Sequence, residues 1–231
     1  MQPNYQVYQQ PTTIIPSDQQ KVMRNTWMML GLTMIPTVLG AWVGTNISFT
    51  FMVQHTLMYF ILTMALMFGL FMGISANRNN SVGVVLLLGA TFLLGVMLGP
   101  ILQFALHLSN GAQLIGMAAG GTGAILLTLS TIATVSKRDF SFLGQFLFVG
   151  LVMLILASVA NLFFHIPAMS LAISAIAILI FSGYMLFDVS RVVHGGETNY
   201  IMATLAIYLD VYNIFVNLLS LLIALTGNDR R

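Results

Sequence analysis

The chain contains no cysteine among its 231 residues, which excludes disulfide bonds, thiolate catalysis and metal sites built on cysteine. Charged residues are scarce as well. Asp, Glu, Lys and Arg make up 6% of the sequence, whereas an ordinary soluble domain carries about 25%. The formal net charge of +2 is too small to predict a nucleic-acid partner. So little polar surface is incompatible with a water-soluble globule and predicts an integral membrane protein.

The chain consists largely of long apolar runs, and hydrophobic residues make up 58% of it. A helix that spans a bilayer needs about 20 apolar residues. The sequence therefore predicts an all-α membrane protein, a bundle of seven transmembrane helices, with spans near 26–45, 55–75, 83–106, 113–135, 141–164, 169–190 and 203–226. Three regions follow, which are a flexible cytoplasmic tail (1–24), a transmembrane domain (25–227) and a short C-terminal tail (228–231).

Basic residues in the connecting segments predict the orientation. They lie in every second connection and are absent from loops 46–54, 107–112 and 165–168, whereas the other side carries Lys21, Arg24, Arg78, Lys137, Arg138 and Arg191. The positive-inside rule places the N-terminus in the cytoplasm. Seven crossings then place the C-terminus outside, although Arg230 and Arg231 argue against that side.

Glycine and proline predict features of the helices themselves. The fourth span contains a Gly-x-x-x-Gly spacing between Gly116 and Gly120, which is typical of close helix packing in membranes. Pro36 and Pro100 fall within predicted spans and are expected to kink them.

Two carboxylates lie inside the last two spans, Asp188 in the sixth and Asp210 in the seventh. Ionisable side chains within membrane helices are costly and usually mark a site. Because consecutive spans run antiparallel, we expect the two to lie at similar depth. Two carboxylates close together in a partly dry site cannot both ionise cheaply, so they would share a proton and titrate as a unit. Without that proton they would bind a hard cation through oxygen, as calcium prefers.

Neighbouring residues leave alternatives open. Arg191 follows Asp188 by three residues, so it either holds that carboxylate ionised or marks the membrane interface. Asn213 lies one turn beyond Asp210 and is either an amide ligand or a hydrogen-bonding contact between helices. In a purely structural arrangement, Asp188 would pair with Arg191 and Asp210 would hydrogen bond to a tyrosine, with candidates at Tyr184, Tyr208 and Tyr212.

Enzymatic activity is not expected. Intramembrane aspartyl proteases also carry aspartates on their last spans, but they require Gly-x-Gly before the second acid. Here Ile207, Tyr208 and Leu209 precede Asp210. The Gly-x-Ser-x-Gly motif of rhomboid-type serine proteases is absent from the sequence, and no motif predicts a cofactor.

Several local patterns resemble the transmembrane Bax inhibitor motif family and are closest to its bacterial YccA-like branch. They are KVMRNTW (21–27), LGPIL (98–102), KRDFSFLG (137–144), ANLFFHIPAMSLAIS (160–174), HGGETNYI (194–201) and YNIFVNLLSLL (212–222). The resemblance implies seven helices in the bacterial inner membrane with a cytoplasmic N-terminus.

The resemblance also implies two functions. Some bacterial members of this family are proton-sensitive calcium leaks gated by aspartates on the last two helices, a role that would fall to Asp188 and Asp210. The YccA-like branch modulates FtsH, a membrane-anchored AAA protease. The tail (1–24) would then be the segment that this protease engages. A tail with no partner is an equally open interpretation. The sequence does not predict an oligomeric state.

Overall fold

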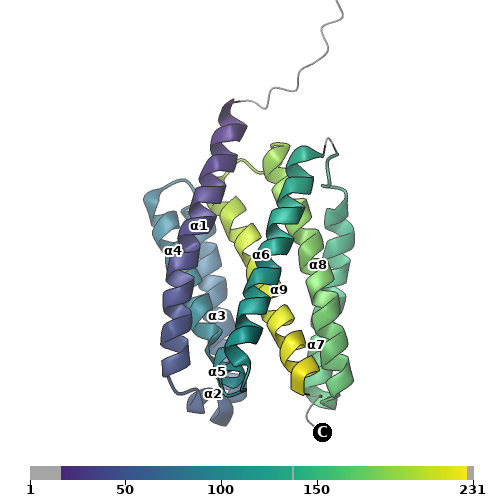
Figure 1. Cartoon of the computed structure of the whole chain (residues 1–231). Coiled ribbons are helices and arrows are strands. Elements are labelled where there is room, and N and C mark those ends of the chain that lie inside the picture. The colour runs from purple at the N-terminus through teal and green to yellow at the C-terminus, as the bar shows by residue number, and fades with distance from the viewer. Residues whose placement is uncertain (1–16, 137, 228–231) are drawn as a thin grey trace, which may run out of the picture.

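The computed structural model describes residues 17–136 and 138–227 of the chain. This part of the chain is almost entirely helical and contains no strand. Its helices are α1 (Ser17–Asn46), α2 (Thr50–Gln54), α3 (Thr56–Ala76), α4 (Ser81–Met97), α5 (Gly99–Leu106), α6 (Gly111–Val135), α7 (Leu143–Phe164), α8 (Pro167–Val193) and α9 (Tyr200–Gly227). They stand side by side in one bundle (Figure 1).

Seven helical stretches are long and apolar enough to cross a membrane, which confirms the predicted fold class. The third stretch, Ser81–Leu106, consists of α4 and α5, which meet at Leu98. Pro100 lies in the first turn of α5, where its missing N–H costs no hydrogen bond, so it separates two helices instead of kinking one. Pro36, in contrast, lies inside α1, which continues on both sides of it.

The first helix begins earlier than the sequence predicted. Residues 17–24 were assigned to a flexible tail, but they form the first turns of α1. Gln and Lys are good helix formers, and Asp18 in the first turn interacts favourably with the helix dipole. With 30 residues, α1 is about 45 Å long at 1.5 Å per residue, more than a bilayer core requires. The remainder of the predicted tail, 1–16, and the predicted C-terminal tail, 228–231, lie outside the described residues.

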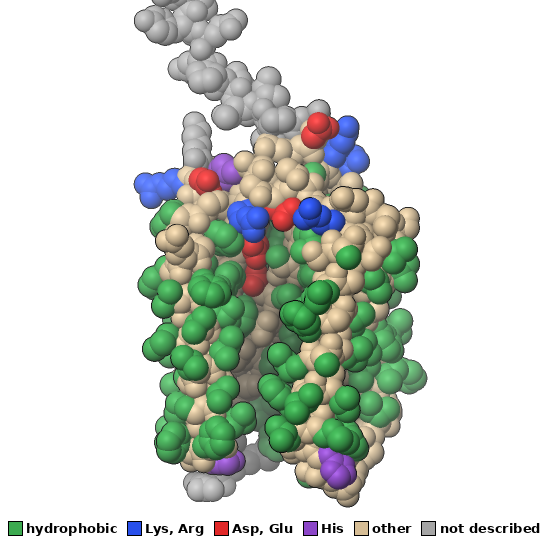
Figure 2. Space-filling model, turned by 180° about the vertical axis from the view of Figure 1, so that it is seen from behind, with side chains coloured by type: hydrophobic (Ala, Val, Ile, Leu, Met, Phe, Trp, Pro, Cys, Tyr) green, Lys and Arg blue, Asp and Glu red, His purple; other side chains and the backbone are tan. Residues whose placement is uncertain are grey.

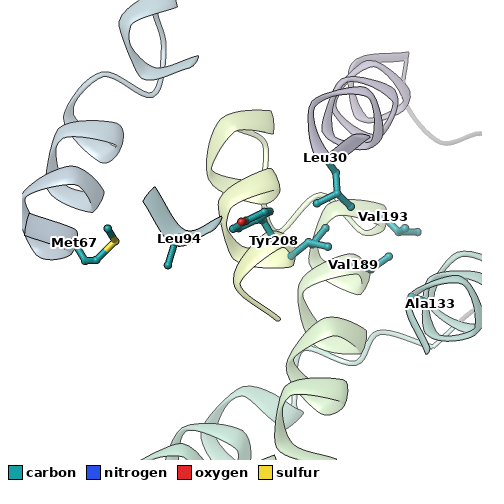
Figure 3. Packing of buried hydrophobic residues seen from close by; sticks show 8 residues of the cluster. Leu30, Met67, Leu94, Ala133, Val189, Val193 and Tyr208 are labelled. Carbon is teal, nitrogen blue, oxygen red and sulfur yellow. The ribbon is translucent and has the colours of Figure 1, made fainter. Parts of the chain in front are cut away.

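Helix α9 is the centre of the bundle. It packs against α1, α3, α4, α5, α6 and α8, and α7 reaches the bundle through α8. Tyr208 of α9 is only 1% exposed and lies between Leu94 of α4 and Val189 of α8 (Figure 3). Its hydroxyl forms a hydrogen bond of 2.8 Å with the Thr37 hydroxyl of α1. A polar group on the central helix is thus satisfied inside the core, as a dry environment requires.

The Gly-x-x-x-Gly spacings that pack closely lie between α1 and α4–α5, not at Gly116 and Gly120 of α6 as predicted. Gly116 and Gly120 of α6 face open space, with no atom within 4 Å of a Cβ built on either. In contrast, an added Cβ would collide with the backbone of the facing helix at four other glycines. These are Gly40 and Gly44 of α1, and Gly95 and Gly99 of the third span. Both pairs have the Gly-x-x-x-Gly spacing, so two such motifs face each other.

The described Lys and Arg side chains gather at one end of the bundle, which we call the basic end. Here α1 begins, α8 ends and α9 begins, and the residues are Lys21, Arg24, Arg78, Arg138 and Arg191. Figure 2 shows these basic side chains at one end, with acidic side chains in line below some of them. The other end of the described chain carries no Lys or Arg, so the charge asymmetry found in the sequence is a property of the folded bundle.

Candidate functional site

The turn between α8 and α9 is closed by its own hydrogen bonds. The backbone N–H groups of Gly196 and Glu197 both donate to the Arg191 carbonyl, at 2.8 and 3.1 Å. Gly195 has φ of 79°, a left-handed conformation that glycine adopts without strain. A Cβ there would also collide with the Gln19 side chain of α1. The turn therefore holds the end of α8 in a fixed place beside α1.

Asn199 fixes the start of α9. Its Oδ1 accepts hydrogen bonds from the N–H groups of Ile201 and Met202, each at 3.1 Å. Its Nδ2 donates to the Arg78 carbonyl at 2.8 Å and to Asn79 Oδ1 at 2.9 Å, in the turn between α3 and α4. One side chain thus caps the helix and anchors it to a neighbouring turn. With both ends of the α8–α9 turn fixed, the two helices pack as antiparallel neighbours.

The structure brings Asp188 of α8 and Asp210 of α9 together. Their carboxyl groups lie close enough to interact electrostatically with each other. Asp210 is only 4% exposed, and its Oδ2 is buried with no hydrogen-bond partner among the described residues. A buried carboxylate oxygen without a donor is energetically costly. A proton shared between the two carboxyl groups would supply the missing donor.

Arg191 lies above this pair without a direct ion pair to it. Its guanidinium lies 3.8 Å from Glu197 Oε2, donates to the Gly196 carbonyl at 3.2 Å and stacks 5.5 Å from the centre of the Phe187 ring. It interacts with Asp188 only at longer range, as does Glu197. The predicted alternative of an Asp188–Arg191 pair is therefore not formed. Arg191 belongs to the turn at the basic end.

The tyrosines do not provide the hydrogen bond to Asp210 that the structural alternative required. The Tyr208 hydroxyl is bonded to Thr37 instead, and Tyr212 stacks on Tyr208 at 6.4 Å between ring centroids. Tyr184, one turn before Asp188 on α8, lies within electrostatic range of both carboxyl groups. The sequence had offered Tyr184 only as one of three candidate partners, because its distance to Asp210 depends on how the two helices pack.

Asn213 lies one turn beyond Asp210 and is half-buried. Its Nδ2 donates to the Leu209 carbonyl at 2.8 Å, so the amide oxygen points away from its own helix. Within 17–136 and 138–227 no three His, Asp or Glu side chains form a group that could hold a metal ion. The oxygens available to a cation near this pair are thus two carboxylates, an amide and a phenol.

A second polar cluster at the basic end was missed in the sequence. The Ser190 hydroxyl of α8 accepts a hydrogen bond from the Phe140 N–H at 3.0 Å and lies 3.5 Å from Asp139 Oδ1 and 3.3 Å from His194 Nδ1. Hydrogen bonds from Ser141 lower the pKa of Asp139. The cluster ties the α6–α7 loop to α8. Asp139 and Phe140 lie about fifty residues before Ser190 in the chain, so local spacing gave no signal for this contact.

Comparison with known proteins identifies the bundle. Residues 19–228 match the model of the family described as "Inhibitor of apoptosis-promoting Bax1". The chain belongs to this Bax inhibitor family. The match covers all seven membrane-spanning stretches, and it confirms the family resemblance seen in the sequence.

Several relatives align with this Bax inhibitor family member over nearly its whole length. It is 41% identical over 202 residues to "Modulator of FtsH protease YccA" of Escherichia coli strain K12, covering 87% of this chain and 89% of the relative. An uncharacterized protein of Neisseria meningitidis serogroup A is 40% identical over 210 residues, covering 90% and 92%. An uncharacterized membrane protein of Vibrio cholerae is 39% identical over 209 residues, with the same coverage. The YccA-like assignment within the family rests on these matches.

Proposed function

We propose that this Bax inhibitor family protein is a pH-sensitive cation leak, for calcium, gated by Asp188 and Asp210. One observation supports the proposal above the others. One carboxyl oxygen inside a membrane-spanning bundle, Asp210 Oδ2, is buried without a hydrogen-bond donor among the described residues, and a second carboxyl group lies near it on an antiparallel helix. Such groups are expensive in a membrane and usually mark an ion or proton pathway.

The gate would work through the shared proton. While the proton is held, the carboxyl–carboxylate hydrogen bond ties α8 to α9 near the basic end. When it leaves, two like charges face each other in a poorly hydrated site and repel. The helices then separate, and a divalent cation is attracted to the two negative charges. Calcium flux is therefore expected to rise with pH.

In this proposal the basic end faces the cytoplasm and the bundle lies in a bacterial inner membrane, with the C-terminus outside. The gathering of the described Lys and Arg side chains at one end supports this orientation through the positive-inside rule. The relative from Escherichia coli O6:H1 is named "Inner membrane protein YccA". The aspartate pair then lies toward the cytoplasmic side.

Calcium flux into proteoliposomes tests the proposal. Flux is measured between about pH 5 and pH 8, the range over which a group that titrates near neutrality changes charge. Wild type is compared with a variant that carries both Asp188→Asn and Asp210→Asn, and with protein-free liposomes. Wild type should show a flux that rises with pH, and the double variant should show no pH dependence. Wild-type flux no greater than that of protein-free liposomes would refute the proposal.

A second candidate function is binding and modulation of the FtsH protease. It is favoured by the 41% identity to a protein named for that role. Helix α1 offers a contact surface, since it projects beyond its neighbours at the basic end (Figure 1) and exposes Asp18 and Lys21 there. The two functions can coexist, because the aspartate pair is buried whereas a protease contact would use the surface.

Co-purification with FtsH after mild solubilisation distinguishes the candidates. A complex that forms equally well with wild type and with the double aspartate variant would support a partner role independent of the pair. Failure to recover FtsH with wild type would count against that role and would leave the cation leak unaffected.

A further inference from the structure

Polar side chains continue from Asp210 along one face of α9. Asn213, Asn217 and Ser220 follow at intervals of three, four and three residues, the spacing that keeps side chains on one helical face. At a rise of 1.5 Å per residue, successive members lie about 4.5 to 6 Å apart along the helix axis. We call these four residues the polar lane. It leads from the aspartate pair toward the end of the bundle opposite the basic end.

The lane is not sealed in the core. Asn213, Asn217 and Ser220 are half-buried, whereas Ile214 and Leu219 of the same helix are completely buried. Figure 2 shows a hollow in the bundle that runs from below the acidic side chains toward the opposite end. Polar groups at membrane depth are tolerated where they line a water-filled cavity.

The lane presents oxygen atoms outward. The amide nitrogens of Asn213 and Asn217 donate to carbonyls one turn back on α9, of Leu209 and Asn213, each at 2.8 Å. Their Oδ1 atoms receive no hydrogen bond within the part of the chain that the structure describes. Amide oxygens are ligands that hard cations such as calcium accept in place of water.

An open cavity that Ser220 helps to line lies where the lane ends. It has a volume of about 530 Å³ and is bounded by the ends of α7, α8 and α9. Five of its lining residues carry hydroxyl or amide groups, which are Ser158, Asn161, Ser170, Ser174 and Ser220. Asn161 connects the ends of α7 and α8 beside the cavity. Its Nδ2 donates a hydrogen bond to the Ser170 hydroxyl at 2.7 Å, and its Oδ1 accepts one from the Ile166 N–H at 3.1 Å. The cavity is large enough to hold several waters at roughly 30 Å³ each.

We propose that the polar lane is the water-filled route by which cations pass between the aspartate pair and this cavity, with Asn213 and Asn217 as intermediate oxygen ligands. The proposal rests on the proposed function and extends it, since it assigns the half of the path that lies beyond the gate. Oxygen-bearing residues about 4.5 to 6 Å apart along the helix axis let a partly hydrated cation exchange one ligand for the next. A deep single site would hold the ion instead.

The absence of cysteine permits a test that does not depend on transport. Single cysteines replace Asn217, Ile214 and Leu156, and spheroplasts are treated with a membrane-impermeant cationic methanethiosulfonate reagent. Only the thiolate reacts, and a thiol in lipid or in a dry core does not ionise. Asn217→Cys should react at least about tenfold faster than both controls. Ile214 is 0% exposed on the same helix, and Leu156 is 58% exposed on the apolar face of α7, so the controls represent core and lipid.

A flux measurement completes the test. Asn217→Leu should lower calcium flux at high pH about tenfold, as expected for loss of one ligand, and leave the midpoint of the pH dependence unchanged. Asn217→Cys reacting as slowly as Ile214→Cys would overturn the lane, even if wild type leaks calcium through the aspartate gate. Fast reaction without any wild-type flux would refute the proposed function and the passage of cations together, and would leave α9 lining only a water-filled crevice.

Discussion

Asp210→Asn is expected to give a calcium flux that no longer changes with pH. The asparagine amide has nearly the shape of the carboxyl group and donates a hydrogen bond to Asp188 at every pH. The hydrogen that bridges the two side chains is then an amide hydrogen, which does not dissociate, so flux should stay at the low level that wild type shows under acidic conditions. In wild type, release of one proton allows the calcium flux to change by up to about tenfold per pH unit. Proteoliposome flux at a series of pH values measures the difference.

Asp18→Asn is the matched control for this prediction. It removes the same charge from an exposed position in the first turn of α1, where Asp18 lies 3.5 Å from Lys21. The pH profile of this variant should be that of wild type. If flux in Asp210→Asn still titrates as in wild type, the aspartate pair is not the gate.

The second large effect is expected at Gly95. A Cβ at this position would collide with the carbonyl oxygen of Thr37 and lie 3.0 Å from the backbone nitrogen of Ala41, so α1 and α4 would have to separate. Overpacking of this kind costs about 1–3 kcal/mol for one methyl group. Separation would also disturb the hydrogen bond between Thr37 and Tyr208 in the core. Gly95→Ala should therefore lower the free energy of unfolding in mixed micelles by that amount, and Gly95→Leu should prevent folding.

Gly116→Ala provides the comparison, because a Cβ there meets no atom within 4 Å. Replacing an exposed helical glycine by alanine is expected to stabilise α6 by up to about 1 kcal/mol. Equal destabilisation by Gly95→Ala and Gly116→Ala would show that the contact between α1 and α4 does not depend on these glycines.

The sequence was sufficient to predict the spans, because seven apolar stretches separated by short polar segments allow little else in a bilayer. The sequence was less informative about which glycines pack against a neighbouring helix. Gly-x-x-x-Gly occurs in α6 and also at Gly40–Gly44 and Gly95–Gly99, and spacing alone does not show which face meets another helix. The start of α1 was predicted too late because residues 17–24 are mostly polar and carry no apolar periodicity, although they form the first turns of the helix.

The candidate site was predictable in outline for a geometric reason. Asp188 and Asp210 flank one short turn, so antiparallel packing of α8 and α9 brings them together. The contacts of Arg191 were not predictable from the sequence. Arg191 forms an ion pair with Glu197 and not with Asp188 because of how the backbone folds after Gly195. The cluster around Ser190 depends on a loop fifty residues earlier in the chain. Local spacing thus predicts contacts between neighbouring helices, and tertiary packing decides the others.

The central claim is that Asp188 and Asp210 hold one proton between them, and infrared titration of the carboxyl groups tests it most directly. The C=O stretch of a protonated carboxyl group is followed between about pH 5 and pH 8 in wild type, Asp188→Asn and Asp210→Asn. The account predicts one titrating carboxyl band in wild type that shifts or disappears in either single variant, because the proton belongs to the pair. If each variant instead keeps an unshifted band from its remaining aspartate, the two groups titrate independently and the proposed gate is contradicted.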